Sequence, residues 1–204
     1  GQYDRILDLL DTKVRNPESP LVKAMPDATI DLQNVASLLK RLELRGVDVG
    51  DRWHTIAEIC AGRTTDHANP FSSAHDAMAL AAVGRFDLVD ELVANMKGAS
   101  AAHSILGAVT QNLGAPVVEG VVAHQKGNYA RAVDLLWPVR RDLHRIGGSH
   151  AQRDLFFQVL VDAAMRAGRA TQVAILLDDI AGIGFEHVAD RSLYREAAAM
   201  AAQR

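Results

Sequence analysis

Histidine and aspartate side chains gather in the middle of the chain, and these two residue types can bind a divalent metal ion or exchange protons with a substrate. The group consists of His54, Asp66, His67, His75 and Asp76. The segment Asn69-Pro70-Phe71 separates His67 from His75, and we expect Ser72 to cap a helix that carries His75 at its third position. The two histidines then belong to different elements, which is not the spacing of a metal site. Polar packing in the core is the favoured interpretation, ahead of a partner-binding surface and of metal binding or catalysis.

A second polar group lies further along the chain, where His144, His150 and Asp154 occur among several arginines. His150 and Asp154 are four residues apart, so on a helix they share a face, where the carboxylate would orient the imidazole. The segment Ser149-His150-Ala151-Gln152 also has the pattern of a capping box, in which Ser149 is the N-cap. Capping the helix is therefore the first role of this segment. His75, Asp76, His150 and Asp154 are the candidate catalytic residues if the chain is an enzyme.

Four arginines occur within fourteen positions in this region, and we call them the arginine cluster: Arg140, Arg141, Arg145 and Arg153. A planar guanidinium group binds a carboxylate through two parallel hydrogen bonds. The cluster therefore predicts a site for an anionic peptide or ligand. The favoured interpretation is that these side chains stabilise the fold and bridge neighbouring repeats, ahead of such a binding site and of a catalytic role.

Composition narrows the classes of function. The chain has 204 residues, of which 49% are hydrophobic and 23% charged, so it can bury a sizeable core and is not intrinsically disordered. The net charge of −3 disfavours a nucleic-acid partner. We find no apolar run that approaches the roughly 20 residues needed to cross a bilayer, and expect no membrane partner and a cytoplasmic location.

Cofactor chemistry finds little support. The chain has one cysteine, Cys60, which excludes an intramolecular disulfide and a cysteine-rich zinc site, and its helical spacing from Ile56 predicts a small buried hydrophobic residue. The segment Gly182-Ile183-Gly184 lacks the third glycine or lysine of a phosphate-binding loop, and no Gly-x-Ser-x-Gly motif occurs. We therefore predict no cofactor and no metal.

Apolar residues recur at helical spacing along nearly the whole chain. One stripe consists of Tyr3, Ile6, Leu7, Leu10 and Val14, and others follow from Ile30 to Leu42 and from Trp53 to Cys60. Alanine and leucine dominate, and no alternating run with hairpin signals is present. The pattern predicts an all-α chain of about ten or eleven helices.

A turn motif recurs at intervals of about forty residues or twice that. Gly-x-aromatic-x occurs at Gly1, Gly84 and Gly127, a degenerate copy occurs at Gly168, and Gly46 fills the long interval. Glycine is expected at the end of the first helix of each pair, in a conformation with positive φ, and the aromatic residue packs between the two helices.

The copy around Gly127 resembles a tetratricopeptide repeat, since Gly120, Ala123, Tyr129 and Ala132 place small residues and one aromatic residue where two helices meet. Longer stretches are similar to the tetratricopeptide-repeat-protein-38 family: residues 42–53, 74–85 and 140–156. The resemblance spans residues 1 to about 180 and matches the C-terminal part of longer members. It implies an array of helical repeats that binds protein, and it implies no catalytic residue.

We therefore expect one tetratricopeptide-repeat-like all-α domain over residues 1–204, whose concave face binds a peptide, a partner protein or another part of its own chain. The rival is an enzyme or metal-binding protein with a site between the His75 and His150 regions. Gly1 occupies the turn position of a repeat, so the helix from Gln2 to Arg15 is expected to be the second of a pair whose first helix is missing. The chain is then the C-terminal portion of a longer protein, which would self-associate through this helix.

Overall fold

The computed structural model describes residues 2–66, 68–99, 104–183 and 190–203, and within these ranges it contains helices and no strand. The α-helices are α1 (Tyr3–Leu9), α2 (Pro20–Ala24), α3 (Thr29–Glu43), α4 (Arg52–Cys60), α5 (Pro70–Ala82), α6 (Phe86–Gly98), α7 (Ile105–Val109), α8 (Ala115–Gln125), α9 (Tyr129–Val139), α10 (His150–Arg166), α11 (Ala170–Ile183) and α12 (Ser192–Ala201). Four irregular segments extend them: the π-helices η1 (Leu10–Val14) and η3 (Thr110–Gly114), and the 3-10 helices η2 (Ala61–Arg63) and η4 (Arg140–Ile146). Because η3 joins α7 and α8 into one helix, the described part of the chain holds eleven helices, which confirms the expected class and count.

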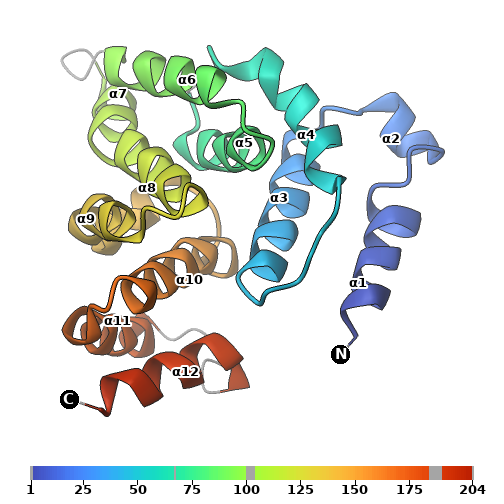
Figure 1. Cartoon of the computed structure of the whole chain (residues 1–204). Helices are drawn as coiled ribbons and strands as arrows, with labels where there is room; N and C mark the ends of the chain where they lie inside the picture. The colour runs from blue at the N-terminus through green and yellow to red at the C-terminus, as the bar shows by residue number, and fades with distance from the viewer. Residues whose placement is uncertain (1, 67, 100–103, 184–189, 204) are drawn as a thin grey trace.

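The helices form two layers (Figure 1). Helices α3, α5, α8 and α10 form the inner layer: α5 packs against α3 and α8, α8 packs against α10, and α10 returns to contact α3. Helices α4, α6, α9 and α11 lie outside them, each against a neighbouring inner helix, and α12 covers α10 and α11. The inner helices α5, α8 and α10 are buried on nearly all sides, as expected for helices without an amphipathic pattern.

Glycine turns end four of the helices in the same way. Gly46, Gly84, Gly127 and Gly168 have φ between 70° and 76°. In each turn the glycine N–H donates to the carbonyl three residues back, and the next N–H donates to the carbonyl five residues back. This is the Schellman arrangement, and it confirms the turns predicted at these four positions. Gly1, the remaining copy of the motif, lies outside the described residues.

Close contacts between helices form where the sequence places small residues. A Cβ atom on Gly120 of α8 would lie 2.5 Å from Leu136 Cγ of α9, so only glycine allows these two helices to approach this closely. Tyr129, at the start of α9, packs edge-to-face on His124 of α8 with ring centroids 5.4 Å apart. The predicted wedge between the two helices is therefore present.

Helix α5 begins earlier than the sequence suggested. Asn69, and not Ser72, is the N-cap: its side chain accepts hydrogen bonds from the N–H groups of Phe71 and Ser72. Pro70 takes the first helical position, where its fixed φ and missing N–H are favourable. His75 consequently lies one full turn inside the helix, and its Nδ1 lies 2.7 Å from the Phe71 carbonyl oxygen.

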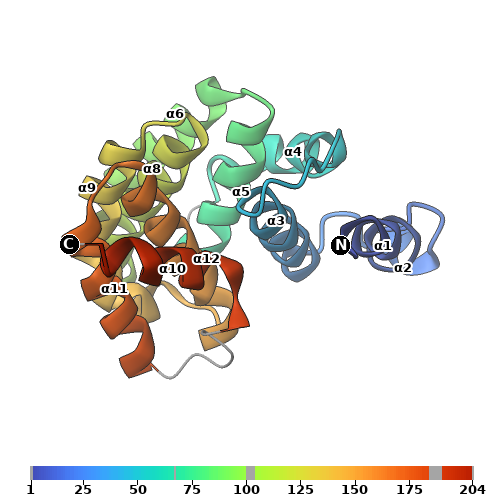
Figure 2. The ribbon, with the colours of Figure 1, turned by 60° about the horizontal axis from the view of Figure 1, so that its bottom comes forward.

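The N-terminal helices lie at one end of the molecule, beyond α3 and α4 (Figure 2). The predicted apolar stripe of α1 is only partly covered: Leu7 and Leu10 are buried, whereas Tyr3 and Val14 are 39% and 50% exposed. Leu9, Leu21 and Met25 are also exposed. The helix continues as the π-helix η1, which ends at Val14. Self-association through Gln2–Arg15 stays a prediction.

The continuous helix Ile105–Gln125 is long and apolar enough to cross a membrane by length and mean hydropathy alone. The expectation that no apolar run approaches such a length was therefore wrong for this segment. More than half of the helix is buried within the fold, where its second half packs against α5 and α9. The cytoplasmic location stays a prediction.

Candidate functional site

His75 lies inside the core. It is 2% exposed, and its ring contacts Phe71 and Phe156, with centroid distances of 4.5 and 5.7 Å. Burial in this apolar environment lowers the pKa of His75 to about 4, since the charged form loses its solvation. The neutral imidazole thus serves as a packing element between α5 and α10.

Asp76 is directed to a different neighbour. The Cys60 thiol donates to Asp76 Oδ1 at 3.2 Å, and Arg63 Nε lies 4.0 Å from Asp76 Oδ2. Burial raises the pKa of the Asp76 carboxyl and also that of the Cys60 thiol. Cys60 is buried, as predicted, and its thiol is far from ionising at neutral pH.

His150 and Asp154 share one helix and have different environments. His150 is exposed at the start of α10, within the capping box of Ser149 and Gln152 that the sequence predicted. Asp154 is 2% exposed, and its carboxylate accepts hydrogen bonds from Gln158, Arg191 and Tyr194. None of the four candidate catalytic side chains bonds to another in the described part of the chain.

The arginine cluster contacts neighbouring protein groups. Arg140 Nε and Arg141 Nη2 each lie 2.8 Å from an oxygen of Asp179, which ties η4 to α11. Although partial burial raises the pKa of the Asp179 carboxyl, hydrogen bonds from Arg141 and Arg140 bring it below its usual value. Arg145 lies 3.7 Å from Asp142, and Arg153 donates to the carbonyl groups of the turn at 147–148.

A groove of about 480 Å³ opens between α3, the first half of α10 and the start of α12. We call it the arginine groove, after the three arginines in its walls: Arg41, Arg45 and Arg191. The other lining residues are Asn34, Ser37, Leu38, Ala151, Gln152, Asp154 and Gln158. Asp154 is the only carboxylate among these lining residues.

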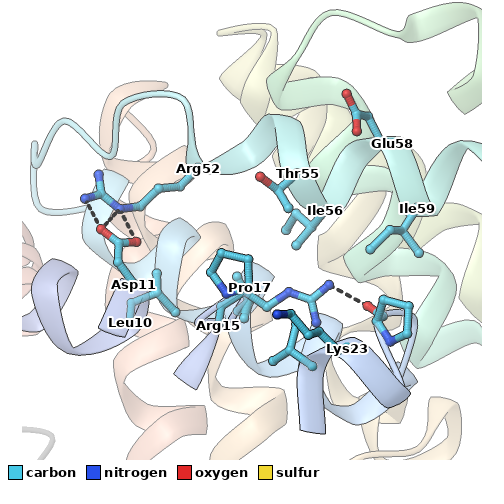
Figure 3. Close-up of a pocket in the computed structure, with 13 residues that line it drawn as sticks. Leu10, Asp11, Arg15, Pro17, Lys23, Arg52, Thr55, Ile56, Glu58 and Ile59 are labelled. Carbon is cyan, nitrogen blue, oxygen red and sulfur yellow. Dashed lines mark hydrogen bonds and ion pairs between the residues drawn. The ribbon is translucent and has the colours of Figure 1, made fainter. Parts of the chain in front are cut away.

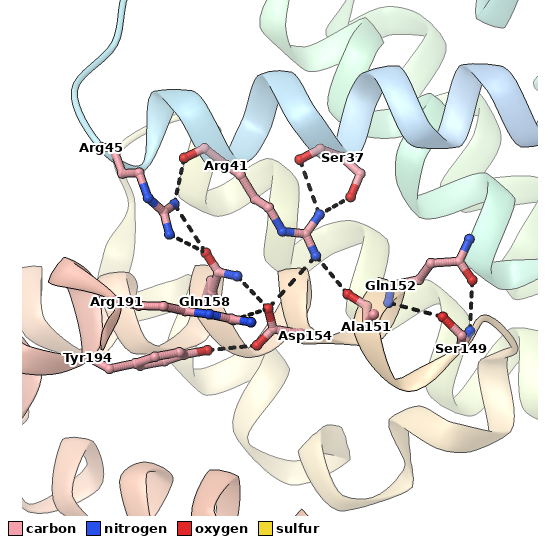
Figure 4. A network of polar contacts seen from close by, with 10 residues as sticks. All are labelled: Ser37, Arg41, Arg45, Ser149, Ala151, Gln152, Asp154, Gln158, Arg191 and Tyr194. Atoms are coloured by element: carbon pink, nitrogen blue, oxygen red, sulfur yellow. Dashed lines mark hydrogen bonds and ion pairs between the residues drawn. The ribbon is translucent and has the colours of Figure 1, made fainter. Parts of the chain in front are cut away.

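Asp154 lies at the centre of this network (Figure 4). Gln158 Nε2 donates to Asp154 Oδ2 at 2.6 Å, and the Tyr194 hydroxyl donates to Oδ1 at 2.9 Å. Arg191 also donates to Oδ2, and Arg41 Nη2 lies 3.9 Å from the same oxygen. One buried carboxylate therefore holds α10, α12 and the C-terminal half of α3 together.

Arg41 of α3 and Arg45, just after its end, carry charge that this carboxylate does not fully balance. Arg41 donates to the Ser37 hydroxyl and to the Ala151 carbonyl, both of which are neutral. Arg45 donates to the Arg41 carbonyl at 2.8 Å and to Gln158 Oε1 at 3.3 Å, and these acceptors are neutral too. Burial lowers the pKa of the Arg41 guanidinium, and the like charges of Arg191 and Arg45 act in the same direction. Two guanidinium groups that hydrogen-bond only to neutral acceptors among the described residues make this side of the groove suited to a further anion.

A second cluster escaped the sequence analysis because its members lie far apart in the chain. His124 Nε2 lies 2.7 Å from Asp162 Oδ2, although 38 residues separate the two. Asp162 also binds Arg166, and Lys40 donates to Glu43 and Gln125. These groups line a cavity of about 230 Å³ between α3, α8 and α10. The charged groups of this cluster already pair with one another. We therefore interpret the cluster as a structural connection between the three helices.

Metal binding finds no support in the described ranges, where no group of three or more histidine, cysteine, aspartate or glutamate residues is arranged to hold an ion. His67, His103 and His187 lie outside those ranges. No profile of a known protein family matches the chain, and no solved structure matches it at a significant level.

Proposed function

We propose that this protein is a tetratricopeptide-repeat-like interaction module that binds an acidic segment of a partner protein in the arginine groove. The observation that carries the proposal is that Arg41 and Arg45, in the wall of the groove, donate hydrogen bonds only to neutral acceptors within the described part of the chain. The bound segment supplies carboxylates to the Arg41 and Arg45 guanidinium groups. An acidic segment of another part of its own chain would satisfy the same chemistry.

The helical architecture supports the proposal. Three helix pairs, α5–α6, α8–α9 and α10–α11, are each joined by a short turn that contains a glycine with positive φ. Their first helices pack side by side in the inner layer. Arrays of stacked helix pairs present extended surfaces to peptide ligands.

The position of the charges supports it as well. The Arg45 guanidinium donates only to neutral acceptors within the described part of the chain, so a carboxylate of the ligand gains charge-assisted hydrogen bonds without displacing an internal ion pair. The arginine cluster of residues 140–153 differs in this respect, since Arg140 and Arg141 already bind Asp179.

The proposal is tested with a short fluorescent peptide of alternating glutamate and serine, whose anisotropy is followed as the protein is added. A matched peptide with glutamine in place of glutamate is the control. We expect the acidic peptide to bind at least about tenfold more tightly, and its affinity to fall as salt rises from about 0.05 to about 0.5 M. Equal affinity for the two peptides, or no binding of either, would contradict the proposal.

A further inference from the structure

A cavity of about 630 Å³ lies between the N-terminal segment and the α3–α4 pair, on a different part of the molecule from the arginine groove (Figure 3). Its walls come from η1, the chain through α2, helix α3 and helix α4. The lining is predominantly aliphatic: Leu10, Pro17, Val22, Pro26, Val35, Ile56 and Ile59. Cavities of several hundred Å³ with apolar walls and a few polar groups are typical small-molecule sites.

Arg15 is the unusual member of the wall. Its Nη2 donates to the Pro26 carbonyl at 2.5 Å. Its Nε and Nη1 atoms are buried, and neither has a hydrogen-bond partner in the described part of the chain. Burying guanidinium donors without acceptors is unfavourable, because the group loses water and gains nothing in exchange. An acceptor that enters the cavity removes this cost.

The other charged groups of the lining have partners or lie apart from Arg15. Arg52 binds Asp11 through three hydrogen bonds of 2.6–3.2 Å, and Lys23 binds Glu18 at 2.6 Å. The Glu58 side chain lies across the cavity from Arg15 (Figure 3). Arg15 is thus the cation in this wall whose hydrogen-bonding capacity is incompletely used.

We propose that this cavity binds a small carboxylic acid with an apolar body, whose carboxylate pairs with Arg15 and whose body contacts the aliphatic walls. Val22 of α2 and Ile59 of α4 are partly exposed and offer surface to the body, and Leu10, Val35 and Ile56 form the buried floor beneath them. The ligand therefore joins the N-terminal helices to the rest of the fold.

The local backbone allows Arg15 to reach the ligand. Arg15 directly follows η1, a π-helix, and such irregular turns often occur at binding sites. The guanidinium group needs only side-chain rotations to turn from the wall toward the cavity, since a single hydrogen bond, to the Pro26 carbonyl, holds it.

The test uses 4-phenylbutyrate as the probe and 4-phenylbutyramide, its neutral analogue, as the control ligand. Binding to the whole chain is followed by NMR of the methyl groups of Ile56 and Ile59, both of which line the cavity. We expect the acid to shift these signals at about tenfold lower concentration than the amide.

Two variants complete the test. Arg15→Gln should bring the affinity for the acid down to that for the amide, while the affinity for the amide is unchanged, which also shows that the cavity is intact. Arg5→Gln, which removes the same charge from an exposed position of α1, should leave both affinities unchanged. The inference is overturned if acid and amide bind equally to the natural chain, if neither shifts the Ile56 and Ile59 signals, or if Arg15→Gln keeps the preference for the acid.

Discussion

Two groups of arginines in this protein are used in different ways. In the arginine cluster, Arg140 and Arg141 share the carboxylate of Asp179, which is partly exposed, and Arg141 itself is largely open to solvent. In the arginine groove, Arg191 binds the buried carboxylate of Asp154, whereas Arg41 and Arg45 donate hydrogen bonds only to neutral acceptors among the described residues. The members of the cluster are close in sequence, and Arg140 and Arg141 bridge η4 and α11. The groove is assembled from three distant segments, and we propose that it binds an anion.

Removing the central carboxylate of each network should show this difference most strongly. Asp154→Ala removes the buried carboxylate to which Gln158, Arg191 and Tyr194 donate, so we expect the free energy of unfolding to fall by about 3–5 kcal/mol. Asp179→Ala removes a partly exposed acceptor and should cost about 1 kcal/mol. Urea denaturation of the two variants measures both losses, and equal losses would remove the distinction between the networks.

As the pH is lowered, the first loss of folding stability should come from His75, which lies near the arginine groove. His75, near Arg41, has a folded-state pKa of about 4 and an unfolded value near 6.5, so the unfolded chain takes up a proton between these pH values while the folded chain does not. Its stabilising contribution is complete above pH 6.5 and falls by about 3 kcal/mol as the pH is lowered to 4.

Asp179 also contributes to the pH dependence of stability, but for a different reason. The pKa of His75 is lowered by burial, whereas that of Asp179 is raised by partial burial and brought below its usual value by hydrogen bonds from Arg141 and Arg140. Its pKa is lowered, so its stabilisation is present above about pH 4 and is lost only below it. Denaturation of the natural chain and of His75→Phe at a series of pH values separates the two effects. If the stability of His75→Phe declines between pH 6.5 and 4 as steeply as that of the natural chain, His75 does not cause this decline.

The turn between Arg145 and Arg153 offers a smaller effect with a close control. A Cβ atom on Gly148, at φ 75°, would lie 2.5 Å from Phe71 Cε2, whereas on Gly147, at φ 106°, its nearest contact would be 3.6 Å. We expect Gly148→Ala to destabilise by about 2 kcal/mol or more and Gly147→Ala by about 1 kcal/mol. Thermal or urea denaturation ranks the two, and the reverse order would contradict the packing of this turn on Phe71.

Metal removal should have no effect on either network. Treatment with a strong chelator is expected to leave the helical circular dichroism and the melting temperature unchanged, because arginine side chains pair with the carboxylates of both networks. A marked drop in melting temperature would contradict this prediction and would indicate that histidine and aspartate side chains bind a metal ion.

Local signals were sufficient for much of the fold. The turns at Gly46, Gly84, Gly127 and Gly168 were predictable because a Schellman turn depends on a few neighbouring residues. The capping box at Ser149 was predictable for the same reason. The N-cap of α5 was misplaced at Ser72 because Asn69-Pro70 was assigned to a loop, although asparagine followed by proline also suits a helix start.

The candidate site was beyond local signals. Arg41 and Ala151 are 110 residues apart, and Asp154 and Arg191 are 37 apart, so their meeting depends on how α3, α10 and α12 pack. The pairing of His124 with Asp162 was missed for the same reason. Residue spacing predicted which arginines are close in sequence, whereas tertiary packing determines which ones share a groove.

The most direct test compares one arginine from each group in the binding of the glutamate-serine peptide. Arg45→Gln and Arg145→Gln remove the same charge, and neither residue is held in the core. We predict that Arg45→Gln lowers the affinity about tenfold and that Arg145→Gln leaves it unchanged. Equal affinities for the two variants, or a larger loss in Arg145→Gln, would contradict the assignment of the acidic segment to the arginine groove.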